Sequence, residues 1–121
     1  MGRHILVVMS SPTEGMEEEY NAWYSNVHLQ EVVEIPGYVS AQRFKMADTQ
    51  LKDILTPDEA NRTYGETEHR YLAIYEMEAE SAGAAVQALR EARPNFRMSP
   101  GLGVEINVWA YTPITDVVRS P

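Results

Sequence analysis

The sequence predicts an α+β fold of the ferredoxin-like type, a four-stranded antiparallel sheet with two helices on one face. Three observations carry this prediction. Four segments are rich in β-branched and aromatic residues, two segments have a helical apolar period, and their order along the chain is β-α-β-β-α-β. The 121 residues have no room for a second core, so we expect a single domain over residues 1–121.

The first strand is expected over residues 3–10, where a nearly continuous apolar run ends in Ser-Ser-Pro. A helical period begins after Gly15 and stops before Pro36-Gly37, since proline disfavours a helical residue before it. The period consists of two apolar sets that are slightly out of phase. They are Met16, Tyr20, Trp23, Tyr24 and Val27, followed by Leu29, Val32, Val33 and Ile35. We therefore expect the helix to kink or pause at residues 26–28.

Residues 38–46 and 70–77 are expected to form the second and third strands, again from their β-forming composition. Residues 47–68 between these strands are polar and too numerous for a hairpin turn. The tetrapeptide Thr56-Pro57-Asp58-Glu59 has the residues of a helix start, with an N-cap threonine, a proline in the first position and a capping-box glutamate. A short helix is therefore predicted near residues 57–62.

The second long helix is predicted at residues 81–93, because small and apolar side chains share one face and Arg93-Pro94 ends the pattern. Residues 104–112 form the last predicted strand, which alternates strictly between two faces. Val104, Ile106, Val108 and Ala110 make one face, and Glu105, Asn107, Trp109 and Tyr111 make the other. The helices leave one apolar sheet face open, and we expect a second copy of the chain to cover it by two-fold symmetry.

Composition excludes several classes of function. The net charge is −8, with eight scattered arginines and two lysines, so neither nucleic acid nor an anionic membrane is an expected partner. The absence of cysteine excludes disulfides, thiolate metal sites and cysteine nucleophiles. No apolar run approaches the roughly 20 residues of a membrane span, and we expect a cytoplasmic protein. The three histidines have no metal-ligand spacing, so no metal site is expected.

Residues 18–44, EEYNAWYSNVHLQEVVEIPGYVSAQRF, resemble the EthD-like branch of the dimeric α+β barrel superfamily. The shared features are the aromatic pair Trp23-Tyr24, His28, Pro36-Gly37 and a strand with Ser, Ala and Arg at residues 40–43. The resemblance implies a homodimer that buries a ligand between sheet and helices. Members of the superfamily include cofactor-free quinol monooxygenases, polyketide cyclases, muconolactone-type isomerases, haem-degrading enzymes and proteins without a known reaction. No obvious haem-ligand arrangement of the family can be placed on this sequence, so haem is a minor alternative and we expect no cofactor.

His28 is the candidate catalytic residue, because imidazole exchanges protons near neutral pH and the resemblance points to this position. The alternative is a structural histidine that caps the helix at the kink. Arg43 is a candidate for holding a carboxylate or enolate oxygen, or else for a surface ion pair. The aromatic candidates have core or dimer-interface packing as their alternative. The full set of substrate-binding candidates is Asn21, Tyr24, Arg43, His69, Tyr75, Trp109 and Tyr111.

These features predict a small cofactor-independent enzyme acting on an apolar oxygenated metabolite, such as an aromatic, quinone-like or lactone compound. The expected chemistry is proton transfer of the isomerase, cyclase or lyase kind, or cofactor-free oxygenation, with His28 as general acid or base. A non-catalytic binding or accessory protein for a hydrophobic metabolite or a partner enzyme is the alternative. A third reading is purely structural, with Trp109 and Tyr111 packed against the partner subunit. The sequence does not choose among these readings.

Overall fold

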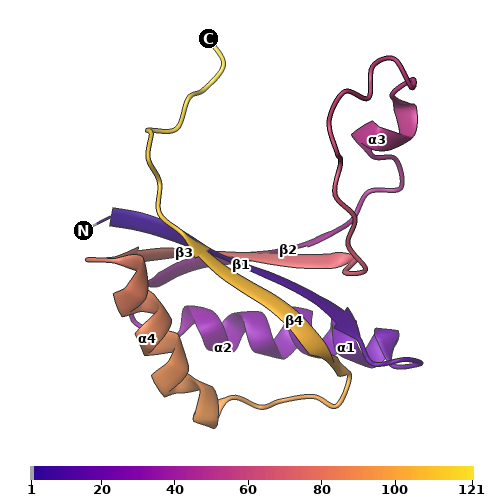
Figure 1. Ribbon diagram of the computed structural model, residues 1–121. Helices are drawn as coiled ribbons and strands as arrows, with labels where there is room; N and C mark the ends of the chain where they lie inside the picture. Colours follow the sequence, from indigo (N-terminus) through magenta and orange to yellow (C-terminus); the bar gives the residue numbers. More distant parts are fainter. Residues whose placement is uncertain (1) are drawn as a thin grey trace.

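The computed structural model describes residues 2–121 and confirms the ferredoxin-like α+β fold. The sheet is antiparallel, with strand order β2-β3-β1-β4. The two long helical segments, residues 17–33 and 82–92, lie together on one face of this sheet, and neither of them covers the other face (Figure 1). The strands are β1 (Gly2–Pro12), β2 (Tyr38–Lys45), β3 (Tyr71–Ala79) and β4 (Leu102–Tyr111).

The first helical segment contains the interruption that its sequence predicts. It consists of α1 (Glu17–Trp23), a π-helical turn η1 (Tyr24–His28) and α2 (Leu29–Val33). A π-turn holds one residue more than an α-helical turn, so it changes the phase of the side chains that follow. The two apolar sets therefore both face the sheet although they are out of phase in the sequence. After α2 the chain turns at Gly37, whose φ of 96° is unfavourable for any residue with a side chain.

The prediction of a helix at residues 57–62 is wrong. The short helix in this segment is α3 (Leu51–Ile54), which begins with a capping box between Gln50 and Asp53. The helix-start signal at Thr56 does form, because Glu59 Oε1 accepts hydrogen bonds from Thr56 N at 3.0 Å and Thr56 Oγ1 at 2.7 Å. The turn does not continue, because the polar residues that follow offer no apolar stripe for packing.

The second long helix is α4 (Ala82–Ala92), capped by Ser81, whose Oγ accepts a hydrogen bond from Ala84 N at 3.1 Å. A 3₁₀ turn, η2 (Arg93–Asn95), follows it and leads towards β4. Both helical segments are tied to the sheet layer by buried polar contacts. The Tyr38 hydroxyl of β2, for example, donates to the Ala85 carbonyl of α4 at 2.9 Å.

Strand register decides which side chains face the helices. Ser10 of β1 is buried, and its Oγ lies 2.6 Å from the hydroxyl of Tyr20 on α1. Even-numbered residues of β1 therefore point towards the helices, and in β4 their partners are even-numbered as well. Trp109, opposite Val7, consequently lies on the other face.

The core between sheet and helices is rich in tyrosine. Five of the seven tyrosines are buried there: Tyr20, Tyr24, Tyr38, Tyr71 and Tyr75. Each ring contributes a large apolar area, and each hydroxyl needs a hydrogen-bond partner when it is buried. Such partners are present, as in the Tyr71 hydroxyl donating to Glu17 Oε2 at 2.5 Å. The core is therefore held by directional bonds as well as by packing.

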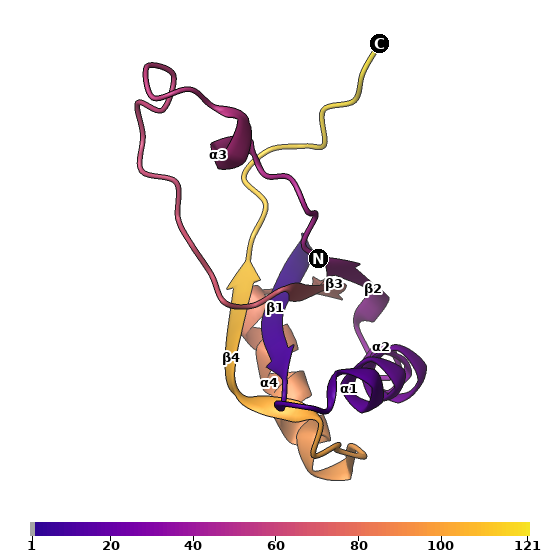
Figure 2. The ribbon, with the colours of Figure 1, turned by 90° about the vertical axis from the view of Figure 1, so that its right-hand side faces the viewer.

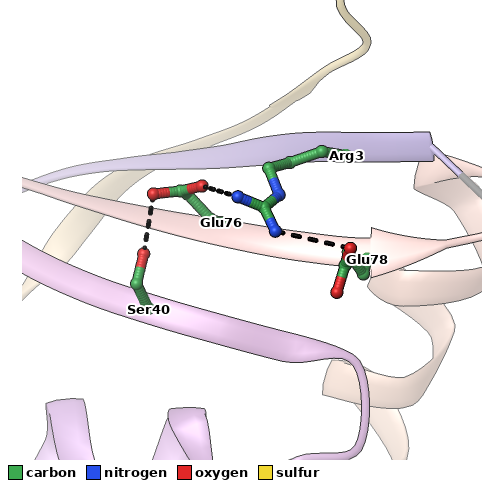
Figure 3. A network of polar contacts seen from close by, with 4 residues as sticks. All are labelled: Arg3, Ser40, Glu76 and Glu78. Atoms are coloured by element: carbon green, nitrogen blue, oxygen red, sulfur yellow. Dashed lines mark hydrogen bonds and ion pairs between the residues drawn. The ribbon is translucent and has the colours of Figure 1, made fainter.

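The open sheet face is apolar over most of its area. Phe44, Trp109 and Tyr111 remain 41%, 57% and 54% exposed. One corner is polar, where Arg3 pairs with two glutamates and Glu76 also accepts a hydrogen bond from Ser40 Oγ at 3.0 Å (Figure 3). Residues 46–70, which include α3, and the C-terminal residues 112–121 both extend to this side of the sheet (Figures 1 and 2). Within residues 2–121, no helix combines the length and apolar character that a bilayer crossing requires.

Candidate active site

A cavity of about 730 Å³ lies between the helix-facing side of the sheet and the helices. Its walls come from β1, β3 and β4, from the first helical segment, and from α4 with the residues after it. The lining is mostly apolar, and its polar side chains are few. The lining residues are Leu6, Val8, Tyr24, His28, Val32, Tyr75, Val86, Leu89, Arg90, Arg93, Pro94, Phe96, Met98, Leu102, Ile106 and Val108. A large apolar hollow with a few converging polar groups is the usual form of a small-molecule site.

A pair of phenols stands at the wall of this cavity. Tyr24 comes from the π-turn and Tyr75 from β3, and the Tyr75 hydroxyl donates to the Tyr24 hydroxyl at 3.3 Å. Burial raises the pKa of Tyr24 to about 12 and also raises the pKa of Tyr75, so both phenols are neutral near neutral pH. Because Tyr24 accepts from Tyr75, its own proton is available to a ligand oxygen.

His28, at the end of the π-turn, lies among aromatic rings. Its imidazole stacks on Trp23 with a centroid separation of 4.7 Å, and it meets Tyr24 and Phe96 edge to face at 5.1 and 5.3 Å. Burial lowers the pKa of His28 to about 4, and Glu31 opposes this only in part. Nδ1 is buried and has no hydrogen-bond partner within residues 2–121. A neutral imidazole in the wall of a cavity can exchange a proton with a bound molecule.

Arg43 does not line the cavity, and it contacts the back of the site instead. Its guanidinium carbon lies 4.6 Å from the centre of the Tyr24 ring, in cation–π geometry. Nη1 donates to Ser25 Oγ at 2.8 Å, and Nη2 donates to Asn21 Oδ1 at 2.9 Å. Asn21 in turn donates to the Tyr71 hydroxyl at 3.3 Å. Arg43 and Asn21 thus hold the π-turn and Tyr24 in place from the side away from the cavity lining.

The structure places the other candidates apart from this cavity. Trp109 and Tyr111 lie on the open face of the sheet, so the sheet separates them from His28. His69 precedes β3, and its Nδ1 lies 2.7 Å from Ser11 Oγ. The cavity therefore brings together His28, Tyr24 and Tyr75, and it does not bring in Trp109, Tyr111 or His69.

Several lining residues were missed by the sequence reasoning, most of all Arg90, Arg93 and Phe96. A signal for the two arginines exists, because Val86, Leu89, Arg90 and Arg93 follow the i, i+3, i+4, i+7 spacing of one helix face. Phe96 lies beyond the helix, and no sequence pattern marks it. Over residues 2–121, no three His, Asp or Glu side chains gather in a way that could hold a metal ion.

Comparisons with known proteins show the fold. No protein-family model matches the chain, and no curated protein matches it in sequence. A protein from Shewanella loihica PV-4 provisionally assigned as a monooxygenase matches with TM-score 0.53 and 18% identity, covering 98% of this chain and 97% of the other. An EthD (ethyl tert-butyl ether D) family protein from Bacillus halodurans C-125 matches with TM-score 0.51 and 13% identity, covering 94% and 100%. A hypothetical Arabidopsis thaliana protein has TM-score 0.53, 15% identity and coverages of 98% and 94%. The chain thus has the fold of an EthD family protein, in agreement with the resemblance in residues 18–44.

Proposed function

We propose that the protein is a small cofactor-independent enzyme that transfers a proton within an apolar, oxygenated metabolite. One observation carries the proposal. His28 borders the apolar cavity as a neutral imidazole with an unpartnered Nδ1, next to the paired hydroxyls of Tyr24 and Tyr75. A proton acceptor and a hydrogen-bond donor beside one cavity are the two groups that enolisation needs.

The proposed step begins at a carbon next to a carbonyl group. The C–H bond breaks, its proton moves to the His28 imidazole, and the electron pair moves to the carbonyl oxygen as an enolate. The Tyr24 hydroxyl donates a hydrogen bond to that oxygen as its negative charge develops. Return of the proton to a different carbon completes an isomerisation. With a pKa of about 4, His28 is a weak base and its cation a strong acid, so the substrate C–H must be activated, as between two carbonyls or two rings.

Cofactor-free oxygenation is the second reaction that this site supports. It starts with the same deprotonation, and the resulting carbanion then reacts with dioxygen. At a methylene carbon, one oxygen atom becomes the new carbonyl oxygen and the other leaves as water with the two hydrogens. The provisional monooxygenase assignment of one protein with this fold supports including it, although the shared identity is only 18%. Oxygen uptake in a sealed cell separates this reaction from isomerisation.

Deuterium exchange tests the proposal. 2-Tetralone is a bicyclic ketone with activated C–H groups, and its exchange in D₂O is followed by proton NMR. We expect the protein to accelerate exchange, and His28→Gln to lower that acceleration about 100-fold or more. Gln87→Ala, an exposed substitution on α4, is the control and should match the wild type. Equal acceleration by wild type and His28→Gln would remove His28 from the chemistry.

A non-catalytic binding protein is the second candidate function, and the depressed pKa of His28 favours it. An imidazole that stays neutral far below neutral pH can serve as a hydrogen-bond partner without ever taking a proton. This candidate predicts that 2-tetralone binds with a measurable affinity and leaves with its hydrogens unexchanged. Calorimetry alongside the exchange measurement therefore decides between the two.

We propose further that the protein is a cytoplasmic homodimer whose subunits pack their open sheet faces together. The apolar side chains of this face would be costly to leave in water. The two segments that extend on this side also carry exposed apolar residues, and they are long enough to reach around a second copy. These residues are Leu51, Ile54, Ile114, Val117 and Val118. Light scattering during gel filtration reports the assembly directly.

A further inference from the structure

The charge around the cavity is opposite in sign to the charge of the protein as a whole. The chain has 18 acidic residues and a net charge of −8, yet no aspartate or glutamate lines the cavity. Two arginines do line it, Arg90 and Arg93. The two cations therefore add positive potential at short range, and Glu31, which acts on His28 without lining the cavity, opposes them.

Helix geometry places Arg90 on the cavity side of α4, and Arg93 borders the same cavity from the first position of η2. Val86 and Leu89 share the same stripe, so the apolar part of the helix face comes first and the cationic part lies at its C-terminal end. The chain then continues through Pro94 to Phe96, whose ring contacts His28. The cavity thus has an apolar body and one cationic end.

Neither arginine is engaged by the rest of the protein. Across residues 2–121, no carboxylate lies within ion-pairing distance of Arg90 or Arg93, and no side-chain hydrogen bond reaches either guanidinium. Arg97 shows the contrast, since its Nε lies 3.5 Å from Glu31 Oε2 and its backbone N–H also donates to that carboxylate. A helix C-terminus favours one cation by itself, but it does not require that two cations border the same apolar cavity.

We propose that Arg90 and Arg93 form a subsite for the carboxylate of an otherwise apolar ligand, whose ring system lies in the cavity beside Tyr24 and Tyr75. This inference rests on the proposed function, because it assumes that the cavity holds a metabolite, and it narrows the substrate class to carboxylic acids. A guanidinium group offers two parallel N–H donors that match the two oxygens of a carboxylate. The apolar walls would contact a ring system, but they offer no group that could offset the cost of burying a second charge.

A matched pair of probes tests the subsite. 2-Naphthoate and 2-naphthol share one bicyclic ring system, and only the first is charged near neutral pH. Calorimetry on the wild type, on Arg90→Gln/Arg93→Gln and on Arg62→Gln/Arg119→Gln gives six dissociation constants. The last variant removes the same amount of charge from residues outside the cavity lining, so it controls for the overall field of the protein.

We expect the wild type to bind 2-naphthoate at least tenfold more tightly than 2-naphthol. Arg90→Gln/Arg93→Gln should lower the affinity for 2-naphthoate about 10- to 100-fold and leave the affinity for 2-naphthol within about twofold of the wild type. The control variant should change neither affinity by more than about twofold. Equal binding of the two probes by the wild type would overturn the subsite and leave the proposed function in place. An equal loss of 2-naphthoate affinity in the two double variants would do the same. Failure of both probes to bind would overturn the cavity as a ligand site, and with it the proposed function.

Discussion

Acidification is expected to destabilise the protein through His28. Burial among aromatic rings lowers the pKa of the folded-state imidazole to about 4, whereas an unfolded chain has the ordinary value of 6.5. Above pH 6.5 the imidazole is neutral in both states, and it contributes no pH dependence. Between pH 6.5 and about 4 the unfolded chain binds a proton that the folded protein does not, so stability falls as the pH falls. Below about pH 4 both states are protonated and the loss is complete.

The size of the effect follows from the same two values. One pH unit corresponds to about 1.4 kcal/mol, and the gap between 6.5 and about 4 therefore amounts to about 3 kcal/mol. The imidazole is only partly buried, and solvent screening lowers the expected loss to about 2 to 3 kcal/mol. This is a large part of the stability of a typical small domain.

Urea unfolding over this pH range, with wild type and His28→Gln at the same protein concentration, measures the loss. Carboxylates titrate in both proteins, so the difference between the two free energies of unfolding isolates the imidazole. We expect wild type to lose about 2 to 3 kcal/mol more than His28→Gln on going from pH 6.5 to 4. Parallel pH profiles would refute the reasoning. An NMR titration of the His28 ring in the wild type with a midpoint near 6.5 would refute it as well.

Three further changes probe the core, the open face and the π-turn. Tyr20→Phe should lower the free energy of urea unfolding by about 1 to 3 kcal/mol, because it leaves the buried Ser10 hydroxyl without its partner; an unchanged value would contradict this. If the protein forms the proposed dimer, Trp109→Glu should give a monomer in light scattering, whereas Val104→Glu, at a fully exposed position of the same strand, should not. A monomer in both variants would assign the effect to charge alone, and a monomeric wild type would refute the proposed dimer. Arg43→Lys should cost about 1 kcal/mol in urea unfolding, since an ammonium group cannot reproduce the two guanidinium bonds and the ring contacts; a neutral result would show that they contribute little.

The fold was predictable from the sequence because each strand is rich in β-forming residues and each long helix has an apolar period. The π-turn was also foreseen in part, since two out-of-phase apolar sets cannot share one regular helix face. The error at residues 57–62 shows the limit of local signals. Thr56 and Glu59 form the bonds of a helix start, yet a start without an apolar face to pack yields only a turn.

The candidate site was predictable in residues 18–44, which resemble the EthD-like branch, and in β3. His28, Tyr24 and Tyr75 were named from sequence, and they meet at one cavity. The alternating pattern of residues 104–112 assigned Trp109 and the even-numbered residues of β4 to opposite faces of the sheet. It did not show which of the two faces packs against the helices. That choice depends on how β4 pairs with β1, which is a long-range contact.

Arg90 and Arg93 show what sequence reasoning leaves out. Charged residues near the C-terminal end of a helix ordinarily indicate a solvated end, and their spacing with Val86 and Leu89 on one helix face is only a weak local signal against that interpretation. The packing of α4 against β3 and β4 shows that they border a cavity whose lining has no acidic residue.

The π-turn also places a structural constraint on the number of residues in the first helical segment. Each α-helical residue rotates the chain by about 100°, so inserting or deleting one residue while the π-turn stays in place would turn everything beyond the change by that angle. Depending on the position, either His28 would leave the cavity or Val32 would leave the core. An exposed position such as Asn26 can therefore vary in residue type, whereas a change in the number of residues must be offset by a change in the π-turn. Homologues that keep the π-turn should have no insertions or deletions between Gly15 and Pro36, however far their sequences diverge.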